Sequence, residues 1–196
     1  MTTPEAGTQP KLFYPQYQST IRRAPAQPLI RLPQDFGDLS APVYGYLPLG
    51  ETDNDLTRQH AGEPLGERII VAGRVVDEDG RPVPHTLVEV WQCNAAGRYM
   101  HARDDHPAPL DPNFSGGGRM MTDAQGHYQF TTIKPGAYPW RNHHNAWRPA
   151  HIHFAIIAPG YDTCVTHLFQ QGDEFIETDV VYGVKAPLIV EFVKKP

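Results

Sequence analysis

Short runs of β-branched and aromatic residues, each closed by turn-forming residues, constrain this chain more than any other feature of its sequence. Residues 68–76, for example, end at the turn-forming cluster 77–80. Such runs predict β-strands, because β-branched side chains fit a pleated sheet and glycine, aspartate and proline interrupt it. The pattern recurs at residues 86–91, 120–122, 127–132, 151–157, 164–169 and 187–193. We therefore expect an all-β fold, an antiparallel β-sandwich, in which 120–122 and 127–132 form a hairpin.

The first 66 residues have a different character. They are rich in proline, glutamine, threonine and aspartate and show no sustained period. Because each proline biases the preceding residue towards extended backbone, we expect an extended N-terminal arm over residues 1–66. Its aromatic residues predict that the arm packs on the chain's own core or on a partner. The sandwich domain is then expected over residues 67–196.

Composition excludes several classes of protein. With 17 basic and 22 acidic residues the formal charge is −5, which argues against nucleic acid or an anionic membrane as the main partner. The sequence contains no apolar run of 18 residues, and its start does not read as a signal peptide, so we expect a cytoplasmic protein. Two cysteines cannot form a zinc site of three or four thiolates. A metal site would have to use histidine, tyrosine or carboxylate ligands.

The sharpest local feature is the pair His151 and His153. Side chains alternate along a strand, so both imidazoles face the same side and can bind one metal ion with little backbone strain. The alternative interpretation is two histidines on a polar face of a sheet. Two tyrosines follow turn-forming residues elsewhere, Tyr99 after Gly97 and Tyr138 after Gly136. Each of them alone is more readily explained as a packed or rim aromatic.

The ligand types narrow the choice of metal. Zinc held by two imidazoles would want a nearby carboxylate or thiolate, and an Fe(II) facial triad would want a carboxylate in place of the second histidine. Tyrosinate is a hard anionic ligand that favours Fe(III), and a coordinated cation removes the phenol proton. Two phenolates and two imidazoles would leave one position for hydroxide.

Five stretches of the sequence, taken together, resemble the intradiol ring-cleavage dioxygenases, and within that family the protocatechuate 3,4-dioxygenase β chains. The residues that carry the resemblance are 66–92, 97–105, 108–123, 132–142 and 147–154. The resemblance implies a prealbumin-like antiparallel β-sandwich and a catalytic domain over residues 67–196. It also implies a non-haem Fe(III) ion bound by Tyr99, Tyr138, His151 and His153.

The resemblance implies roles for further residues. Arg148 matches the active-site arginine of the family, and Tyr138 matches the ligand that leaves the iron when substrate binds. Trp91, Trp140 and Tyr17 match positions that contact or surround the substrate. His167 falls where protocatechuate enzymes carry a glutamine beside the arginine. We therefore expect either a catalytic role for His167 or a hydrogen-bonded strand histidine.

The C-terminal segment departs from this pattern. Residues 158–193 look more like the catechol and hydroxyquinol dioxygenases than the protocatechuate β chains. Relatives also carry a further loop and strand, so the sandwich is expected to lack a final strand.

The implied reaction inserts both atoms of O2 into a small aromatic diol, converting protocatechuate to 3-carboxy-cis,cis-muconate. Catechol, hydroxyquinol or another substituted catechol is the alternative substrate. A non-catalytic prealbumin-like binding module is a remote alternative. The implied partner is an α-type chain or further copies of this chain.

Overall fold

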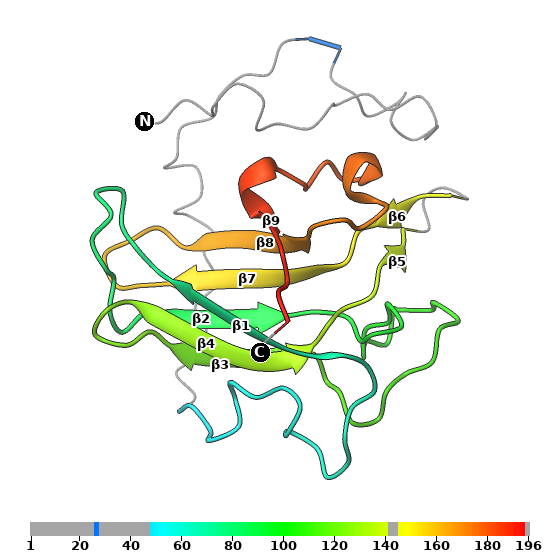
Figure 1. The fold of residues 1–196 in the computed structure, drawn as a ribbon, viewed down its shortest axis with the longest axis horizontal. Helices are drawn as coiled ribbons and strands as arrows, with labels where there is room; N and C mark the ends of the chain where they lie inside the picture. Colours follow the sequence, from blue (N-terminus) through cyan, green and yellow to red (C-terminus); the bar gives the residue numbers. More distant parts are fainter. Residues whose placement is uncertain (1–25, 28–47, 141–144, 195–196) are drawn as a thin grey trace.

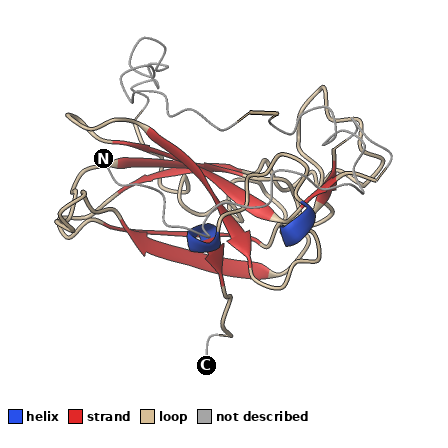
Figure 2. Ribbon diagram, turned by 90° about the horizontal axis from the view of Figure 1, so that it is seen from above, coloured by secondary structure: helices blue, strands red, loops and turns tan. Residues whose placement is uncertain are grey.

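The computed structural model of the chain describes residues 26–27, 48–140 and 145–194. A five-stranded sheet and a two-stranded sheet face each other in it (Figure 1). The large sheet has the order β3-β2-β7-β8-β9, and the small one pairs β1 with β4. The strands are β1 (Arg68–Arg74), β2 (Leu87–Trp91), β3 (Gly117–Met121), β4 (His127–Ile133), β5 (Tyr138–Pro139), β6 (Trp147–Arg148), β7 (His151–Ile157), β8 (Cys164–Gln170) and β9 (Ile189–Val190). Single-turn 3-10 helices lie at Ile176–Thr178 and Ala186–Leu188 (Figure 2). The β-sandwich predicted from the sequence is confirmed.

Alternation along the strands builds the core between the two sheets. In β2 the side chains of Val88 and Val90 are buried, and in β7 those of Ile152 and Phe154. They meet Val71, Phe130 and the rest of one hydrophobic cluster contributed by both sheets. Because successive side chains point to opposite faces, His151 and His153 lie on the outer face of the large sheet, away from this cluster. The candidate ligands on β7 are therefore separate from the apolar core.

The predicted hairpin of residues 120–122 with 127–132 is wrong. A tight turn does join the two segments, with hydrogen bonds across Asp123 and His127. However, β3 pairs with β2 in the large sheet, and β4 pairs with β1 in the small sheet. The turn therefore connects the two layers of the sandwich, because Met120 of β3 and Phe130 of β4 enter the core from opposite sheets.

The strand predicted at residues 187–193 is shorter than expected, and it pairs in parallel where an antiparallel neighbour was expected. Only Ile189–Val190 of this segment is a strand. The residues before it, Ala186–Leu188, form a 3-10 turn that contains Pro187. This strand pairs with the end of β8 in a parallel orientation, whereas all other neighbouring strands of the described chain pair antiparallel.

Part of the segment expected to form an arm is described, and it packs on the sandwich. Leu56 is fully buried in the core cluster, and its backbone N–H donates to the carbonyl of Thr131 in β4 at 2.9 Å. The boundary at residue 66 stays a prediction, and residues 1–25 and 28–47, with Tyr17, lie outside the described residues. No helix in the described ranges is long and apolar enough to cross a membrane.

Candidate metal centre

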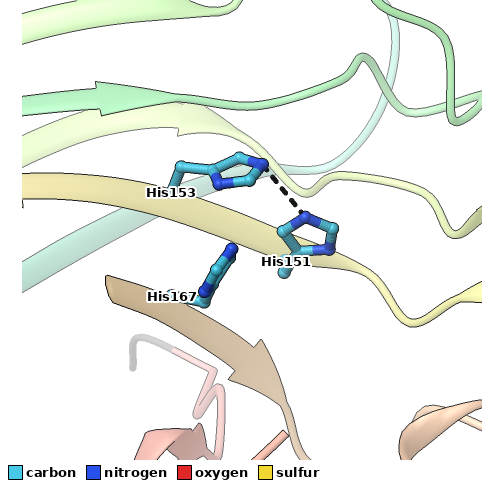
Figure 3. A group of neighbouring side chains, drawn as sticks. All are labelled: His151, His153 and His167. Atoms are coloured by element: carbon cyan, nitrogen blue, oxygen red, sulfur yellow. Dashed lines mark hydrogen bonds between the residues drawn. The ribbon is translucent and has the colours of Figure 1, made fainter. Parts of the chain in front are cut away.

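Two imidazoles from β7 converge on one point at the outer face of the large sheet. The Nε2 atoms of His151 and His153 lie 3.1 Å apart (Figure 3). This separation is less than twice the metal–imidazole bond length of about 2.1 Å, so one ion can contact both nitrogens. The Nδ1 atom of His151 lies 2.7 Å from the carbonyl oxygen of Pro149. An Nδ1–H that donates to this carbonyl leaves the Nε2 lone pair of His151 available for a metal.

Both imidazoles are kept neutral by their surroundings. Burial lowers the pKa of His151 to about 2, helped by the positive charge of Arg148. Burial also lowers the pKa of His153 to about 3, with contributions from His167 and Arg148. A neutral imidazole is the form that binds a metal, so neither residue has to lose a proton at neutral pH.

Tyr99 and Tyr138 reach the same place from two turns that pack against each other. Gly97 lies in the turn before Tyr99 with φ +78°, and a Cβ atom on it would come within 2.0 Å of the carbonyl oxygen of Ala137. Only glycine permits both this backbone conformation and this approach. The Tyr99 backbone N–H donates to Asp104 at 2.8 Å, which fixes the chain after the turn.

The phenol rings of Tyr99 and Tyr138 lie edge to face, with centroids 5.5 Å apart. The ring centroids of Tyr138 and His151 are also 5.5 Å apart. The Tyr99 hydroxyl is buried without a hydrogen-bond partner, although the Tyr138 phenol lies close enough to help raise its pKa. Burial is the main cause that raises the pKa of both phenols, and Arg148 acts in the opposite direction. An unpaired buried hydroxyl costs about 1–3 kcal/mol, which a bound cation would offset. The donor set therefore fits a cation that accepts hard oxygen ligands.

Arg148 lies directly opposite Tyr138 in the pair β5–β6. Its guanidinium forms a buried ion pair with Asp179, and its positive charge lowers the pKa of the Tyr138 phenol against the effect of burial. Burial alone would lower the pKa of Arg148, but the carboxylate of Asp179 outweighs it and raises that pKa. Arg148 is therefore a fixed positive charge at the edge of the centre.

The remaining predicted residues surround the donors unequally. Trp91 stacks on the imidazole of His153, with ring centroids 4.7 Å apart and planes 4° from parallel, and it stays 37% exposed. His167 faces His153 from the neighbouring strand β8, with centroids 4.6 Å apart (Figure 3). The ligand nitrogens of His151, His153 and His167 all lie within 4.8 Å of one another. Trp140 is exposed at the end of β5, where its backbone N–H donates to Ala146.

Sequence reasoning missed two acidic residues at this centre. Asp104 holds the backbone beyond Tyr99, and Asp179 holds Arg148. Asp104 lies close to its tyrosine in the sequence and could have been noticed there. Asp179 is 31 positions from Arg148, so no local pattern joins the two. The two cysteines are free, Cys93 in the interior and Cys164 at the surface.

Together the fold and the site define a β-sandwich with two phenols and two imidazoles gathered on one outer face. A family model described as "Dioxygenase" matches residues 39–195, and one described as "Protocatechuate 3,4-dioxygenase beta subunit N terminal" matches residues 3–35. A protocatechuate 3,4-dioxygenase beta chain of Burkholderia cepacia is 54% identical over 176 residues, which cover 88% of this chain and 75% of the relative. The chain therefore belongs to the intradiol ring-cleavage dioxygenase family.

More distant relatives carry other substrate names. A 6-chlorohydroxyquinol 1,2-dioxygenase of Cupriavidus pinatubonensis is 39% identical over 141 residues, 66% of this chain and 49% of the relative. The crystal structure of a 3-chlorocatechol 1,2-dioxygenase from Rhodococcus opacus is 28% identical with a TM-score of 0.64, covering 79% of this chain and 64% of that one. The chain thus spans three quarters of the Burkholderia relative but only about half of the hydroxyquinol enzyme.

Proposed function

We propose that this chain binds Fe(III) through Tyr99, Tyr138, His151 and His153 and cleaves the ring of protocatechuate between its two hydroxyl-bearing carbons. The observation that carries the proposal is the convergence of these four donor side chains, two of them at a 3.1 Å nitrogen–nitrogen distance. The 54% identity to a protocatechuate 3,4-dioxygenase beta chain supports this substrate.

The charge of the donor set suits a ferric ion. Two phenolates and one hydroxide neutralise three positive charges, which a partly buried site tolerates. Bound by these four residues, Fe(III) would supply a Lewis acid that holds the catechol as its doubly deprotonated form, whose ring is electron-rich enough to react with dioxygen at carbon. The product of ring opening with protocatechuate is 3-carboxy-cis,cis-muconate.

The protein's own groups prepare the substrate. Tyr138 would hold the ion as a phenolate, and burial, which raises the pKa of this phenol, would favour its taking up a catechol proton when the substrate replaces it. Arg148 stabilises negative charge on the ring, since a guanidinium keeps its own proton and its position is fixed before substrate binds. Trp91 forms a partly exposed aromatic wall beside His153.

Hydroxyquinol is the second candidate substrate, because several relatives that bear this name are 33–37% identical to the chain. We further propose that the chain works with an α-type partner chain or with copies of itself, as the beta-chain name of the Burkholderia relative suggests.

One experiment tests the proposal directly. Protein expressed with ample iron should be coloured by tyrosinate-to-iron charge transfer, and it should consume O2 with protocatechuate faster than with hydroxyquinol or catechol. His151→Gln should remove iron and colour, whereas the exposed His127→Gln should keep both. A colourless wild-type protein without bound iron, alone and with an α-type chain, would contradict the proposal. Faster turnover of hydroxyquinol would keep the reaction class and change the substrate.

A further inference from the structure

Asp179, the buried ion-pair partner of Arg148, has no role in the proposed reaction so far. The Arg148 and Asp179 side chains are only 6% and 2% exposed. The Nε atom of Arg148 lies 3.0 Å from Oδ1 of Asp179, and its Nη2 atom lies 3.3 Å from Oδ2. Two roughly parallel hydrogen bonds fix the plane of a guanidinium as well as its place.

The backbone that follows Asp179 holds its carboxylate in turn. The N–H of Gly183 donates to Oδ2 at 2.9 Å, and the N–H of Val181 reaches Oδ1 at 3.5 Å. A Cβ atom on Gly183 would lie 3.0 Å from Nη2 of Arg148 and 3.1 Å from Oδ2 of Asp179. This approach is close enough that a larger residue would press on the ion pair. Asp179 is thus a fixed acceptor and not a mobile surface acid.

Arg148 also lies beside the metal centre, because it is the cross-strand neighbour of Tyr138 in the pair β5–β6. An arginine has five N–H donors in a rigid fork, and Asp179 occupies only part of them. Its positive charge acts on the Tyr138 phenol and lowers the pKa of that group against the effect of burial. Because the fork is planar, the bonds to Asp179 determine where the remaining N–H groups point.

A contribution to the free energy of unfolding is not enough to explain why these two charges are buried together. Burying two charges costs desolvation that their attraction only roughly repays, and apolar replacements of similar size are often as stable. We propose that Asp179 is a positioning residue, which orients Arg148 so that its free N–H groups face Tyr138 and the ring of the bound catechol. The inference rests on the proposed function, since it needs Arg148 to act on the substrate.

The first test replaces the carboxylate by its isosteric amide. In Asp179→Asn holoenzyme we expect iron content and visible colour to stay as in the wild type, while kcat for protocatechuate falls roughly 10-fold to 100-fold with little change in KM. Glu177→Gln is the matched control, since Glu177 is an exposed acid on the same segment, and its kcat should not change. Wild-type kcat in Asp179→Asn would overturn the proposal.

A second test supplies the missing cation from solution, because each single variant leaves one buried charge without its partner. Arg148→Ala should lose most turnover, and millimolar guanidinium chloride should restore part of it by binding at Asp179, whereas potassium chloride should not. The double variant Arg148→Ala/Asp179→Asn carries neither charge, and guanidinium should not restore it. Equal recovery in both variants, or no recovery in Arg148→Ala, would overturn the positioning role. If the wild-type holoprotein cleaves no catechol, the proposed function fails instead.

Discussion

At the scale of single residues, the metal centre combines donors that the protein keeps neutral for different reasons. Burial lowers the pKa of His151 and His153, so these imidazoles bind no proton at neutral pH. Burial raises the pKa of Tyr99 and Tyr138, so these phenols keep theirs until a cation is present. A trivalent cation reverses the cost of charging the phenols, because its field stabilises the phenolates.

Tyr99→Phe separates metal binding from folding. The variant lacks a buried hydroxyl that has no partner, so the free energy of unfolding of the iron-free protein should rise by about 1 kcal/mol. The same change should abolish most of the visible absorption after loading with iron. Urea unfolding of the iron-free protein and the visible spectrum measure the two effects. Tyr128→Phe, which changes a tyrosine outside the centre, should leave the spectrum unchanged; full colour in Tyr99→Phe would refute the ligand assignment.

His167→Gln distinguishes a ligand from a neighbour. His167 lies beside His153 but is not one of the four proposed ligands, so the variant should keep its iron. We expect the ratio of kcat/KM between protocatechuate and hydroxyquinol to change, because the imidazole adjoins the donors from the next strand. Iron analysis together with competition between the two substrates checks this. A loss of iron as large as that in His151→Gln would make His167 a ligand.

The sequence alone pointed to the residues that the structure brings together here. The spacing of His151 and His153 predicted a shared face, and both indeed lie on one side of β7. Asp179 could not be found in this way, since its place beside Arg148 depends on how the segment after β8 folds back. Tyr17 stays a prediction, and the roles of Trp91 and Trp140 do as well.

At the scale of elements, the turn before Tyr99 packs against the turn before Tyr138 where Gly97 meets the carbonyl of Ala137. Gly97→Ala should destabilise the protein by more than about 1 kcal/mol, because it combines positive φ with a Cβ only 2.0 Å from the Ala137 carbonyl oxygen. Gly80→Ala is the matched control, with φ +77° and nothing within 4 Å of the added Cβ. The difference between the two unfolding free energies isolates the contact. Gly97→Ala should also bind less iron, and equal stability of the two variants would contradict this explanation.

Strand positions were predictable because each depends on local alternation, whereas pairing was not. The strand expected at residues 127–132 is present as His127–Ile133, but its partner is β1 and not the adjacent β3. A short turn between two strands is compatible with a hairpin or with a step between layers. The choice depends on long-range burial of Phe130 and Met120, which no local pattern contains.

At the scale of the whole molecule, the buried imidazoles link stability to pH. Their pKa values of about 2 and 3 lie below the ordinary 6.5, so the unfolded chain binds more protons below that pH. The free energy of unfolding of the iron-free protein should therefore fall as the pH drops from 6.5 towards 3, by up to about 1.4 kcal/mol per pH unit for each histidine. Urea unfolding across this range should show a shallower dependence in His151→Gln. The same slope in His151→Gln would contradict the linkage.

The placement of the centre on the outer face of the large sheet bears on how the protein matures. The hydrophobic cluster that holds the two sheets together lies on the other face and includes none of the four donors. We therefore expect the iron-free chain to fold, so that a metal bound at the four donors would enter a sandwich that is already formed.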